Sequence, residues 1–232
     1  MSFARTSIKL LYIDKDIAVI SKPSSLLSVQ YPGSKEKSAI DILEKIMRSR
    51  GLYHKGHRPI AVHRLDRDTS GVMMFALNPH AQKILMDNWQ TIVTERLYIA
   101  VAERLPHARK LDKSGTINMP LAQNAWHQSY VPTNSENLKT QSAITHYKVL
   151  QEGKTHLLLE LSLETGRKNQ IRAHLSAMGY TIAGDKNYKA HTNPFNRLAL
   201  HAYSLCFYHP TTKELMTFKE EEPKEWKSFV IR

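Results

Sequence analysis

Short apolar runs separated by turn residues predict strands along most of the chain. Runs at residues 10–13 and 17–21 flank a polar Asp-Lys-Asp segment, a pattern typical of a β-hairpin. The run "GVMMFAL" at 71–77 is too short for an isolated helix and predicts a buried strand. Further strands are predicted at 95–103, 143–150, 156–163, 197–209 and 214–218, and the second and third of these form a hairpin that turns at "QEGK".

Helix signals are fewer and depend on capping residues. Ser38 with Asp41 three residues later predicts a capping box, and the apolar spacing that follows predicts a helix at 39–50. Gly51 predicts its end, because glycine readily adopts the left-handed conformation that closes helices.

Two further helices are predicted later in the chain. Asn78 followed by Pro79 indicates a helix start, and the amphipathic segment "NQIRAHLSAM" predicts a helix at 169–178. The polar stretch 129–141 predicts a loop. Strands mixed with single helices, without a repeating βαβ pattern, indicate an α+β fold with a large mixed sheet.

Charge adds a functional expectation to this fold. Lys and Arg outnumber Asp and Glu by 33 to 21, and the sequence pI near 9.7 favours a polyanionic partner, with nucleic acid ahead of a membrane. The bulk charge alone also fits a basic surface that only aids solubility. Its distribution favours nucleic acid, because an acid-free stretch contains Lys45, Arg48, Arg50, Lys55, Arg58 and Arg64.

Cysteine content and the apolar runs restrict the compartment. Cys206 is the only cysteine, which excludes an intrachain disulfide and a four-thiolate zinc site. No apolar run has the length of a membrane span, and the N-terminus lacks a signal-peptide core. We expect a cytoplasmic protein with no membrane partner.

Motifs for several common sites are absent. The sequence has no P-loop, G-x-G-x-x-G, G-x-S-x-G or H-E-x-x-H motif. "HKGH" at 54–57 has a spacing that a metal could use, but no acid or thiol lies nearby, so a solvated basic loop is the favoured interpretation. No metal or cofactor is expected.

The segment "HRLDRDTSG" at 63–71 contains the first candidate for chemistry. Asp66 lies between Arg64 and Arg67, and this positive surrounding favours its ionised form as a nucleophile or base. The residues from Asp68 to Gly71 have the composition of a turn. From these residues alone, a salt-bridged turn without chemistry is the favoured interpretation.

A second polar cluster lies about a hundred residues later. "ETGRKNQIRAHL" contains Arg167, Lys168 and Arg172, and "TIAGDKNY" contributes Asp185. Arg172 could pair with Asp66 in the folded chain, although a lone arginine is more often a surface cation.

Together these stretches resemble the RluA-type pseudouridine synthases, which convert uridine to pseudouridine in structured RNA. The resemblance covers nearly the whole chain and rests on "HRLDRDTSG", "ERLYIAV", "TGRKNQIRAH" and the Gly-Asp pair of "TIAGDKNY", in the order of the family. It implies a mostly antiparallel sheet with flanking helices and a central catalytic cleft. It also implies a single catalytic domain at 1–232, similar to short members without an N-terminal RNA-binding module.

The resemblance implies roles for particular residues. The essential aspartate corresponds to Asp66, the active-site tyrosine to Tyr98 and the buried arginine to Arg172. Ile171 would line the uracil pocket, and Arg64 would enter the RNA stack where the target base leaves. Asp66 would either attack C1′ or remove a proton from C2′ of the ribose.

RNA contacts are expected from exposed cations in both clusters. Besides Arg64, they are Lys45, Arg48, Lys55, Arg58, Arg67, Arg167 and Lys168. The expected partner is a ribosomal or transfer RNA, and the expected protein is a monomer.

Three positions depart from the family pattern. Asn169 replaces a usual histidine, Ser25 a usual glycine, and Arg96 a lysine that often precedes the tyrosine. Ser25 is expected to alter a turn outside the chemistry, and Asn169 affects the surroundings of Arg172.

Two other functions remain as alternatives at this point. A non-catalytic RNA-binding or ribosome-assembly protein would explain the charge, but not a carboxylate held within a phosphate-attracting region. A glycosidase would need two carboxylates on either side of the scissile bond, and Asp66 and Asp68 are too close in sequence for that.

Overall fold

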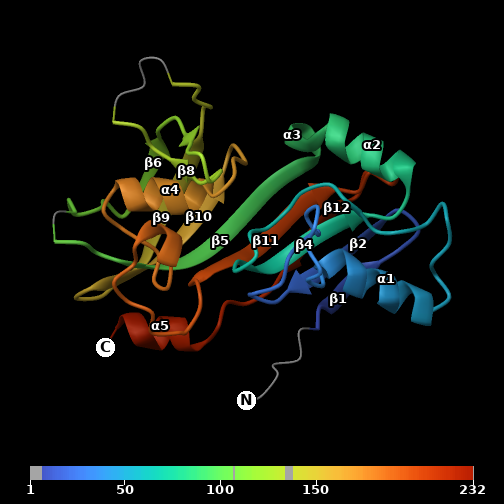
Figure 1. Ribbon diagram of the computed structural model, residues 1–232, viewed down its shortest axis with the longest axis horizontal. Coiled ribbons are helices and arrows are strands. Elements are labelled where there is room, and N and C mark those ends of the chain that lie inside the picture. Colours follow the sequence, from blue (N-terminus) through green and yellow to red (C-terminus); the bar gives the residue numbers. More distant parts are fainter. Residues whose placement is uncertain (1–6, 107, 134–137, 232) are drawn as a thin grey trace. The chain divides into compact units, whose positions relative to one another are not determined.

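The computed structural model describes residues 7–106, 108–133 and 138–231, which group into two compact units (Figure 1). The first unit contains the chain up to Arg96 together with Ala202–Glu221. The second unit contains Leu97–His201 and the chain from Glu222 onwards. Each unit contributes strands, with helices packed against them, and each has residues of the predicted site.

The first unit has the strand order β1-β2-β4-β11, with β3 paired to β4 and β12 paired to β11. β1 pairs with β2, and β2 with β4, in antiparallel register. The helices α1, α2 and α3 lie between its strands in sequence. The elements are β1 (Lys9–Ile13), β2 (Ile17–Lys22), α1 (Ala39–Ser49), β3 (Ile60–Ala61), β4 (Ser70–Ala76), α2 (Pro79–Asp87), α3 (Trp89–Ile92), the start of β5 (Val93–Glu103), most of β11 (Leu200–Tyr208) and β12 (Leu215–Lys219).

Strand β4 is the centre of this unit, and all seven of its residues are buried. Val72 and Met74 share a hydrophobic cluster with Ala81 and Leu85 of α2, so this helix covers one face of the strand. Met73 and Phe75 point to the opposite face, because side chains alternate along a strand, and both are also fully buried. The prediction of a buried strand is confirmed.

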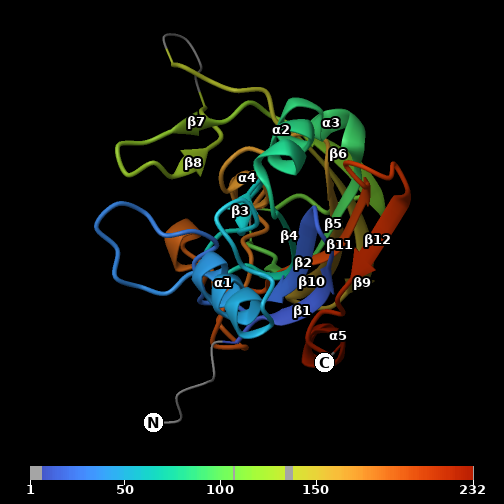
Figure 2. The ribbon, with the colours of Figure 1, turned by 90° about the vertical axis from the view of Figure 1, so that its right-hand side faces the viewer.

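The second unit has the strand order β5-β10-β9-β6, and all of these pairs are antiparallel. A separate two-stranded hairpin, β7–β8, lies beside α4 (Figure 2). The elements are the main part of β5, β6 (Ser114–Asn118), β7 (Ala122–Gln123), β8 (Ser129–Tyr130), β9 (Ile144–Glu152), β10 (His156–Leu163), α4 (Gln170–Ala177), the 3₁₀ turn η1 (Lys186–Tyr188) and α5 (Glu225–Val230).

The helix ends follow the capping residues. The Asp41 N–H donates to Ser38 Oγ, and the Ser38 N–H donates back to the Asp41 carboxylate at 2.8 Å, which completes the capping box of α1. Asn78 Oδ1 accepts from the Ala81 N–H at 2.8 Å and caps α2. Both predicted helix starts are confirmed.

The fold class is the predicted one, an α+β protein with a large, mostly antiparallel sheet and flanking helices. The short elements β3, β6, β7 and α5 were not predicted from sequence, and β8 begins inside the stretch 129–141 that was predicted as a loop. Residues 134–137 of that stretch lie outside the described residues. Among the described helices, none combines the length and apolar character that crossing a membrane requires.

Candidate active site

Asp66 lies half-buried in the loop between β3 and β4 of the first unit. The Thr69 N–H donates to the Asp66 carbonyl oxygen at 3.2 Å, which closes the predicted turn directly after the carboxylate. Thr69 and Ser70 are buried, and β4 follows at once. The loop is therefore fixed at its C-terminal end by a strand in the centre of the unit.

A buried lysine also fixes this loop, through a hydrogen bond to its backbone. Lys22, at the end of β2, is fully buried, and its ammonium donates to the carbonyl oxygen of Arg67 at 2.9 Å. It also donates to the carbonyl oxygens of Pro23 at 2.9 Å and Leu26 at 2.7 Å. A buried charge is costly unless it is well hydrogen-bonded, so these bonds tie the segment after β2 to the backbone beside Asp66.

Two serines extend this contact to both sides of Asp66. Ser28 Oγ donates to the Leu65 carbonyl oxygen at 2.7 Å and accepts from the Leu65 N–H at 3.1 Å. Ser24 Oγ donates to the Asp68 carbonyl oxygen at 2.7 Å. The backbone is thus held one residue before Asp66 and two residues after it.

Ser25 occupies a position that explains the glycine of the family. Its φ is 63°, in the left-handed region where a Cβ is disfavoured and glycine is not. Its hydroxyl donates to Asp68 Oδ1 at 3.4 Å. The turn that contains Ser25 therefore contacts the Asp66 loop.

His63 holds the start of the loop. Its Nε2 accepts from the Met74 N–H of β4 at 2.9 Å, and its ring lies 5.1 Å from that of Trp89. Burial, together with the nearby positive charge of Arg96, lowers the pKa of His63 to about 4. The imidazole is consequently neutral at pH 7, as its acceptor role requires.

Gly71 is required by a close approach of two strands. It has a φ of 114°, and a Cβ at this position would lie 2.1 Å from the carbonyl oxygen of Ala202 in β11. No side chain fits at this distance. Sequence reasoning explained the final glycine of "HRLDRDTSG" by turn geometry alone. The structure shows that packing against β11 also requires a glycine here.

In the second unit, Arg172 of α4 forms a buried ion pair. Its Nε donates to Asp185 Oδ2 at 2.7 Å and its Nη2 to Asp185 Oδ1 at 2.8 Å, a two-pronged geometry. Asp185 is 1% exposed, and the guanidinium also lies 5.1 Å from the Tyr188 ring centre. Sequence reasoning placed Asp185 in this cluster but did not assign it as a partner of Arg172; the Gly-Asp pair was the available indication.

Gln170 organises the turn that leads into α4. Its side-chain oxygen accepts from the Arg167 N–H at 2.9 Å, and its amide nitrogen donates to Ile144 O at 2.9 Å and Thr145 Oγ1 at 3.0 Å. Asn169 adopts a φ of 53°, which asparagine tolerates better than most residues. Sequence reasoning did not single out Gln170, although it belongs to the "TGRKNQIR" segment.

The residue expected as the active-site tyrosine and the residue expected to line the uracil pocket are both in the second unit. Tyr98 is half-buried on β5 opposite Leu161 of β10, and Ile171 of α4 is 4% exposed. The structure thus places Tyr98, Ile171 and Arg172 in one unit, and Asp66 with its supporting residues in the other.

The expected RNA-contacting cations are exposed in both units. They are Lys45, Arg48, Lys55, Arg58, Arg64 and Arg67 in the first unit, and Arg167 and Lys168 in the second. Arg48 pairs with Glu44 at 2.7 Å and Arg67 with Glu36 at 3.2 Å. Such exposed pairs contribute about 1 kcal/mol or less, so phosphate can replace the carboxylate at little cost.

The residues of "HKGH" form a tight turn. The backbone groups of His54 and His57 bond to each other, and the two rings stack at 5.3 Å. Within the described ranges, no group of three or more His, Cys, Asp or Glu side chains could hold a metal ion.

Comparison with known proteins places these residues in a larger context. Residues 16–177, which include Asp66, Tyr98 and Arg172, match the family described as RNA pseudouridylate synthase. An uncharacterized RNA pseudouridine synthase of Aquifex aeolicus is 34% identical, over 95% of this chain and 71% of the relative. The ribosomal large subunit pseudouridine synthase D of Haemophilus influenzae is 30% identical, over 94% of this chain and 68% of the relative.

Solved structures agree on the fold. Human RNA pseudouridylate synthase domain containing 4 superposes with a TM-score of 0.71 at 23% identity, over 94% of this chain and 90% of the other. Human RNA pseudouridylate synthase domain containing 1 gives a TM-score of 0.72 at the same identity, over 96% and 86% of the two chains.

Proposed function

Because this chain belongs to the RNA pseudouridylate synthase family, we propose that Asp66 is the residue with which it acts on the ribose of a target uridine in RNA. The observation that carries this proposal is the loop around Asp66. Buried or partly buried polar side chains hold its backbone on both sides of the carboxylate, through Lys22, Ser24 and Ser28. A carboxylate positioned in this way is suited to chemistry that tolerates little displacement.

The reaction defines what this carboxylate has to do. Isomerisation breaks the bond between N1 and C1′, turns the uracil, and joins C5 to C1′. The base must first leave the RNA stack, which costs a few kcal/mol. Asp66 then either attacks C1′ or removes a proton from C2′, and both routes require it to be ionised and shielded from water.

Arg172 is proposed as the cation that keeps Asp66 ionised during the reaction. Its bonds to Asp185 fix the plane of the guanidinium through Nε and Nη2. A guanidinium has five N–H donors arranged in a fork, so one carboxylate does not use all of them. An opposite charge nearby favours the ionised form of a carboxylate, which burial alone would disfavour.

Tyr98 and Ile171 are proposed to bind the extruded uracil. The tyrosine ring offers a stacking surface and the isoleucine an apolar contact, and both lie in the same unit as Arg172. Arg64 is exposed, and its planar guanidinium is proposed to fill the gap that the extruded base leaves in the RNA stack.

The proposed substrate is ribosomal RNA of the large subunit. This extends to the present chain what the printed names of relatives from Haemophilus influenzae and Buchnera aphidicola state for those proteins. The exposed cations of both units are proposed to hold the phosphates. A purely RNA-binding role is disfavoured, because a carboxylate in a basic region weakens phosphate binding and gains a purpose only in chemistry.

The test is an assay with a matched pair of variants. Asp66→Asn is expected to abolish pseudouridine formation, whereas Asp68→Asn, the same change two residues away, is expected to keep it. Purified proteins are incubated with RNA from a strain that lacks this gene, and pseudouridine is mapped by mass spectrometry in ribosomal and transfer RNA. Pseudouridine made by Asp66→Asn at the parent rate would refute the proposed role.

A further inference from the structure

The β7–β8 hairpin has a feature that the proposed chemistry does not use. Trp126, at its tip, is 84% exposed, whereas Trp226 is fully buried and Trp89 is half-buried. Exposing an indole to water to this extent forgoes much of the free energy that its burial would supply. Tryptophan is enriched at binding interfaces relative to the rest of a protein surface.

The hairpin tip is held in one conformation by several hydrogen bonds. Asn124 Oδ1 accepts from the N–H groups of Trp126 at 3.0 Å and Gln128 at 2.9 Å. The Asn124 carbonyl oxygen also accepts from the His127 N–H at 2.9 Å. The backbone that carries the indole is thus ordered before any ligand binds, which lowers the entropic cost of binding.

The base of the hairpin is attached to the rest of the second unit. Gln128 Nε2 donates to the Asn187 carbonyl oxygen at 2.8 Å, and Tyr188 Oη donates to the Ser129 carbonyl oxygen at 2.5 Å. Tyr188 itself packs beside Arg172. The hairpin is therefore anchored on the same 3₁₀ turn that contacts the proposed catalytic cation.

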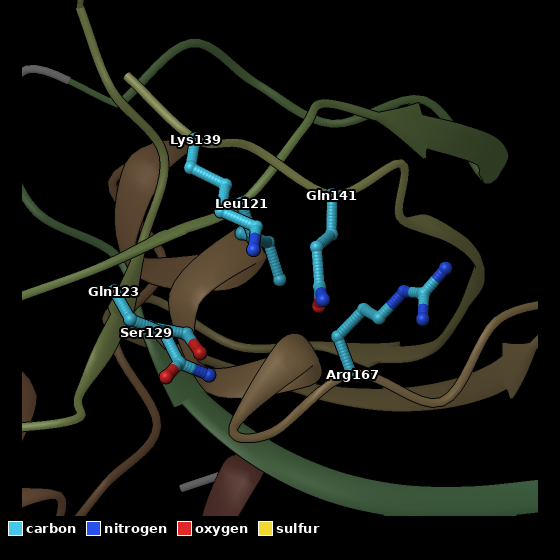
Figure 3. Close-up of a pocket in the computed structure, with 6 residues that line it drawn as sticks. All are labelled: Leu121, Gln123, Ser129, Lys139, Gln141 and Arg167. Carbon is cyan, nitrogen blue, oxygen red and sulfur yellow. The ribbon is translucent and has the colours of Figure 1, made fainter.

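A basic pocket opens at the foot of this hairpin (Figure 3). Its volume is about 310 Å³, and its lining residues are Leu121, Gln123, Ser129, Lys139, Gln141 and Arg167. None of these lining residues is acidic. Gln123 and Ser129 are paired across the hairpin, only three residues on either side of Trp126.

Two of the polar side chains that line the pocket extend toward the same space. In Figure 3 the ammonium of Lys139 and the amide of Gln141 reach into one space, while the Arg167 guanidinium is directed outwards. Arg167 Nε donates to the Ser142 carbonyl oxygen at 3.0 Å. Leu121 and Gln141 exchange two backbone hydrogen bonds of 2.9 Å, so this wall of the pocket is fixed.

We propose that this hairpin and pocket form an RNA contact outside the target uridine, in which Trp126 stacks on an unpaired base and Lys139 binds a neighbouring phosphate. Every base presents a flat face to an aromatic ring, whereas the phosphates require cations without nearby acids. The combination of a rigid indole and a cationic pocket without acids among its described lining residues matches single-stranded RNA. The inference rests on the proposed function, since it takes the RNA substrate as the ligand.

The first test removes the indole. Trp126→Ala is expected to weaken binding of oligouridine and of a stem-loop RNA with uridines in its loop by roughly 5-fold to 150-fold, as the loss of one stacked base does. Trp126→Phe is expected to lose less RNA affinity than Trp126→Ala. Met86→Ala, which removes another exposed apolar side chain, is expected to leave the affinity unchanged. Turnover at saturating RNA is expected to stay at the parent value in Met86→Ala.

Fluorescence provides a direct readout of stacking. Addition of oligouridine is expected to quench the indole emission of the parent protein, and this quenching is expected to be absent in Trp126→Phe, which retains Trp89 and Trp226. Quenching of equal size in Trp126→Phe would overturn the proposal, and so would unchanged RNA affinity in Trp126→Ala. Analytical sedimentation without RNA tests a different role. A dimer that forms in the parent protein and is lost in Trp126→Ala would assign the indole to a contact with a second copy and would also overturn the proposal.

The second test addresses the phosphate contact. Lys139→Gln is expected to reduce the slope of log affinity against log salt by about 0.7, the value for one phosphate of a single strand. Lys154→Gln removes the same charge from the turn beyond the far end of β9 and is expected to leave the slope unchanged. Equal effects of the two variants would overturn the phosphate role. Failure of the proposed function would show instead as activity in Asp66→Asn, which these binding measurements do not involve.

Discussion

At the scale of single residues, the position of Asp66 depends on side chains that take no part in the proposed reaction. Lys22 and Ser28 bond to the loop backbone, and His63 bonds to the strand that follows. Each of these groups is polar and partly or fully buried, so each contributes only while it keeps its bonding partner. The loop geometry is therefore sensitive to the protonation state of His63.

Acid is expected to weaken the protein through His63. The pKa of this imidazole is about 4 in the folded protein, against 6.5 for an ordinary histidine, because burial and Arg96 disfavour the charged form. As pH falls below 6.5, the unfolded state takes up a proton that the folded state does not. The stabilisation is complete above pH 6.5, decreases between pH 6.5 and 4, and amounts to roughly 3 kcal/mol at most.

His63→Gln isolates this contribution, because the glutamine oxygen can accept from the Met74 N–H without titrating. The variant is expected to be less stable than the parent near pH 7.5 and to lose less stability on acidification. Urea unfolding at a series of pH values measures both free energies. Parallel pH profiles for the two proteins would contradict the assignment.

Sequence reasoning proposed Asp66 from its charged surroundings, and Tyr98 and Arg172 from the resemblance to a family whose motifs contain them. It did not identify the residues that hold them. Lys22 reads as an ordinary surface lysine, since nothing in the sequence shows that its ammonium is buried under a loop more than forty residues away. Long-range hydrogen bonds of this kind depend on tertiary structure and leave no periodic pattern.

At the scale of elements, the first three residues of α4 have three different roles. Gln170 fixes the preceding turn, Ile171 is buried, and Arg172 pairs with Asp185. Consecutive residues on a helix point in directions about 100° apart, so these three side chains reach different surroundings. The helix is therefore sensitive to changes at any of them.

Removing only the cation of the buried pair is expected to destabilise the protein strongly. Arg172→Gln leaves the Asp185 carboxylate buried without its cation, which costs about 3–5 kcal/mol. The double variant Arg172→Gln/Asp185→Asn places two neutral amides there and is expected to recover part of this loss. Urea unfolding of the parent, both single variants and the double variant gives the coupling energy.

Activity separates the structural and chemical roles of Arg172. The double variant is expected to fold but to form no pseudouridine, because it lacks the cation proposed to keep Asp66 ionised. Asp185→Asn alone retains the guanidinium and is expected to retain part of the turnover. If the stability losses of the two single variants add up in the double variant, the two residues do not form a coupled pair. Full turnover in the double variant would contradict the proposed role of Arg172.

Length explains why some of the elements were missed from the sequence. α1, α2 and β4 were predicted because capping residues or a continuous apolar run mark them. The strands β3, β7 and β8 contain two residues each, too few to show a period of two. They form because neighbouring segments supply partners, and the functionally interesting Trp126 lies between two of them.

At the scale of the whole molecule, the formal net charge of +12 attracts the phosphates of RNA. Two explanations of how this charge would favour RNA binding differ in where the charge acts. General attraction by net charge would be insensitive to which cations are removed, whereas a specific surface would depend on its own members. The acid-free stretch allows the two to be compared at equal charge.

Neutralising Lys45, Lys55 and Arg58 together is expected to reduce the slope of log affinity against log salt by about 2, if each contacts a phosphate of single-stranded RNA. The matched control replaces Lys83, Lys154 and Lys224, which are also exposed and lie outside this stretch. Both sets change to glutamine, so each lowers the net charge by three. Equilibrium binding of stem-loop RNA between low and moderate salt gives the slopes. Equal slopes for the two triple variants would assign the affinity to net charge and would remove these three residues from the RNA-binding surface.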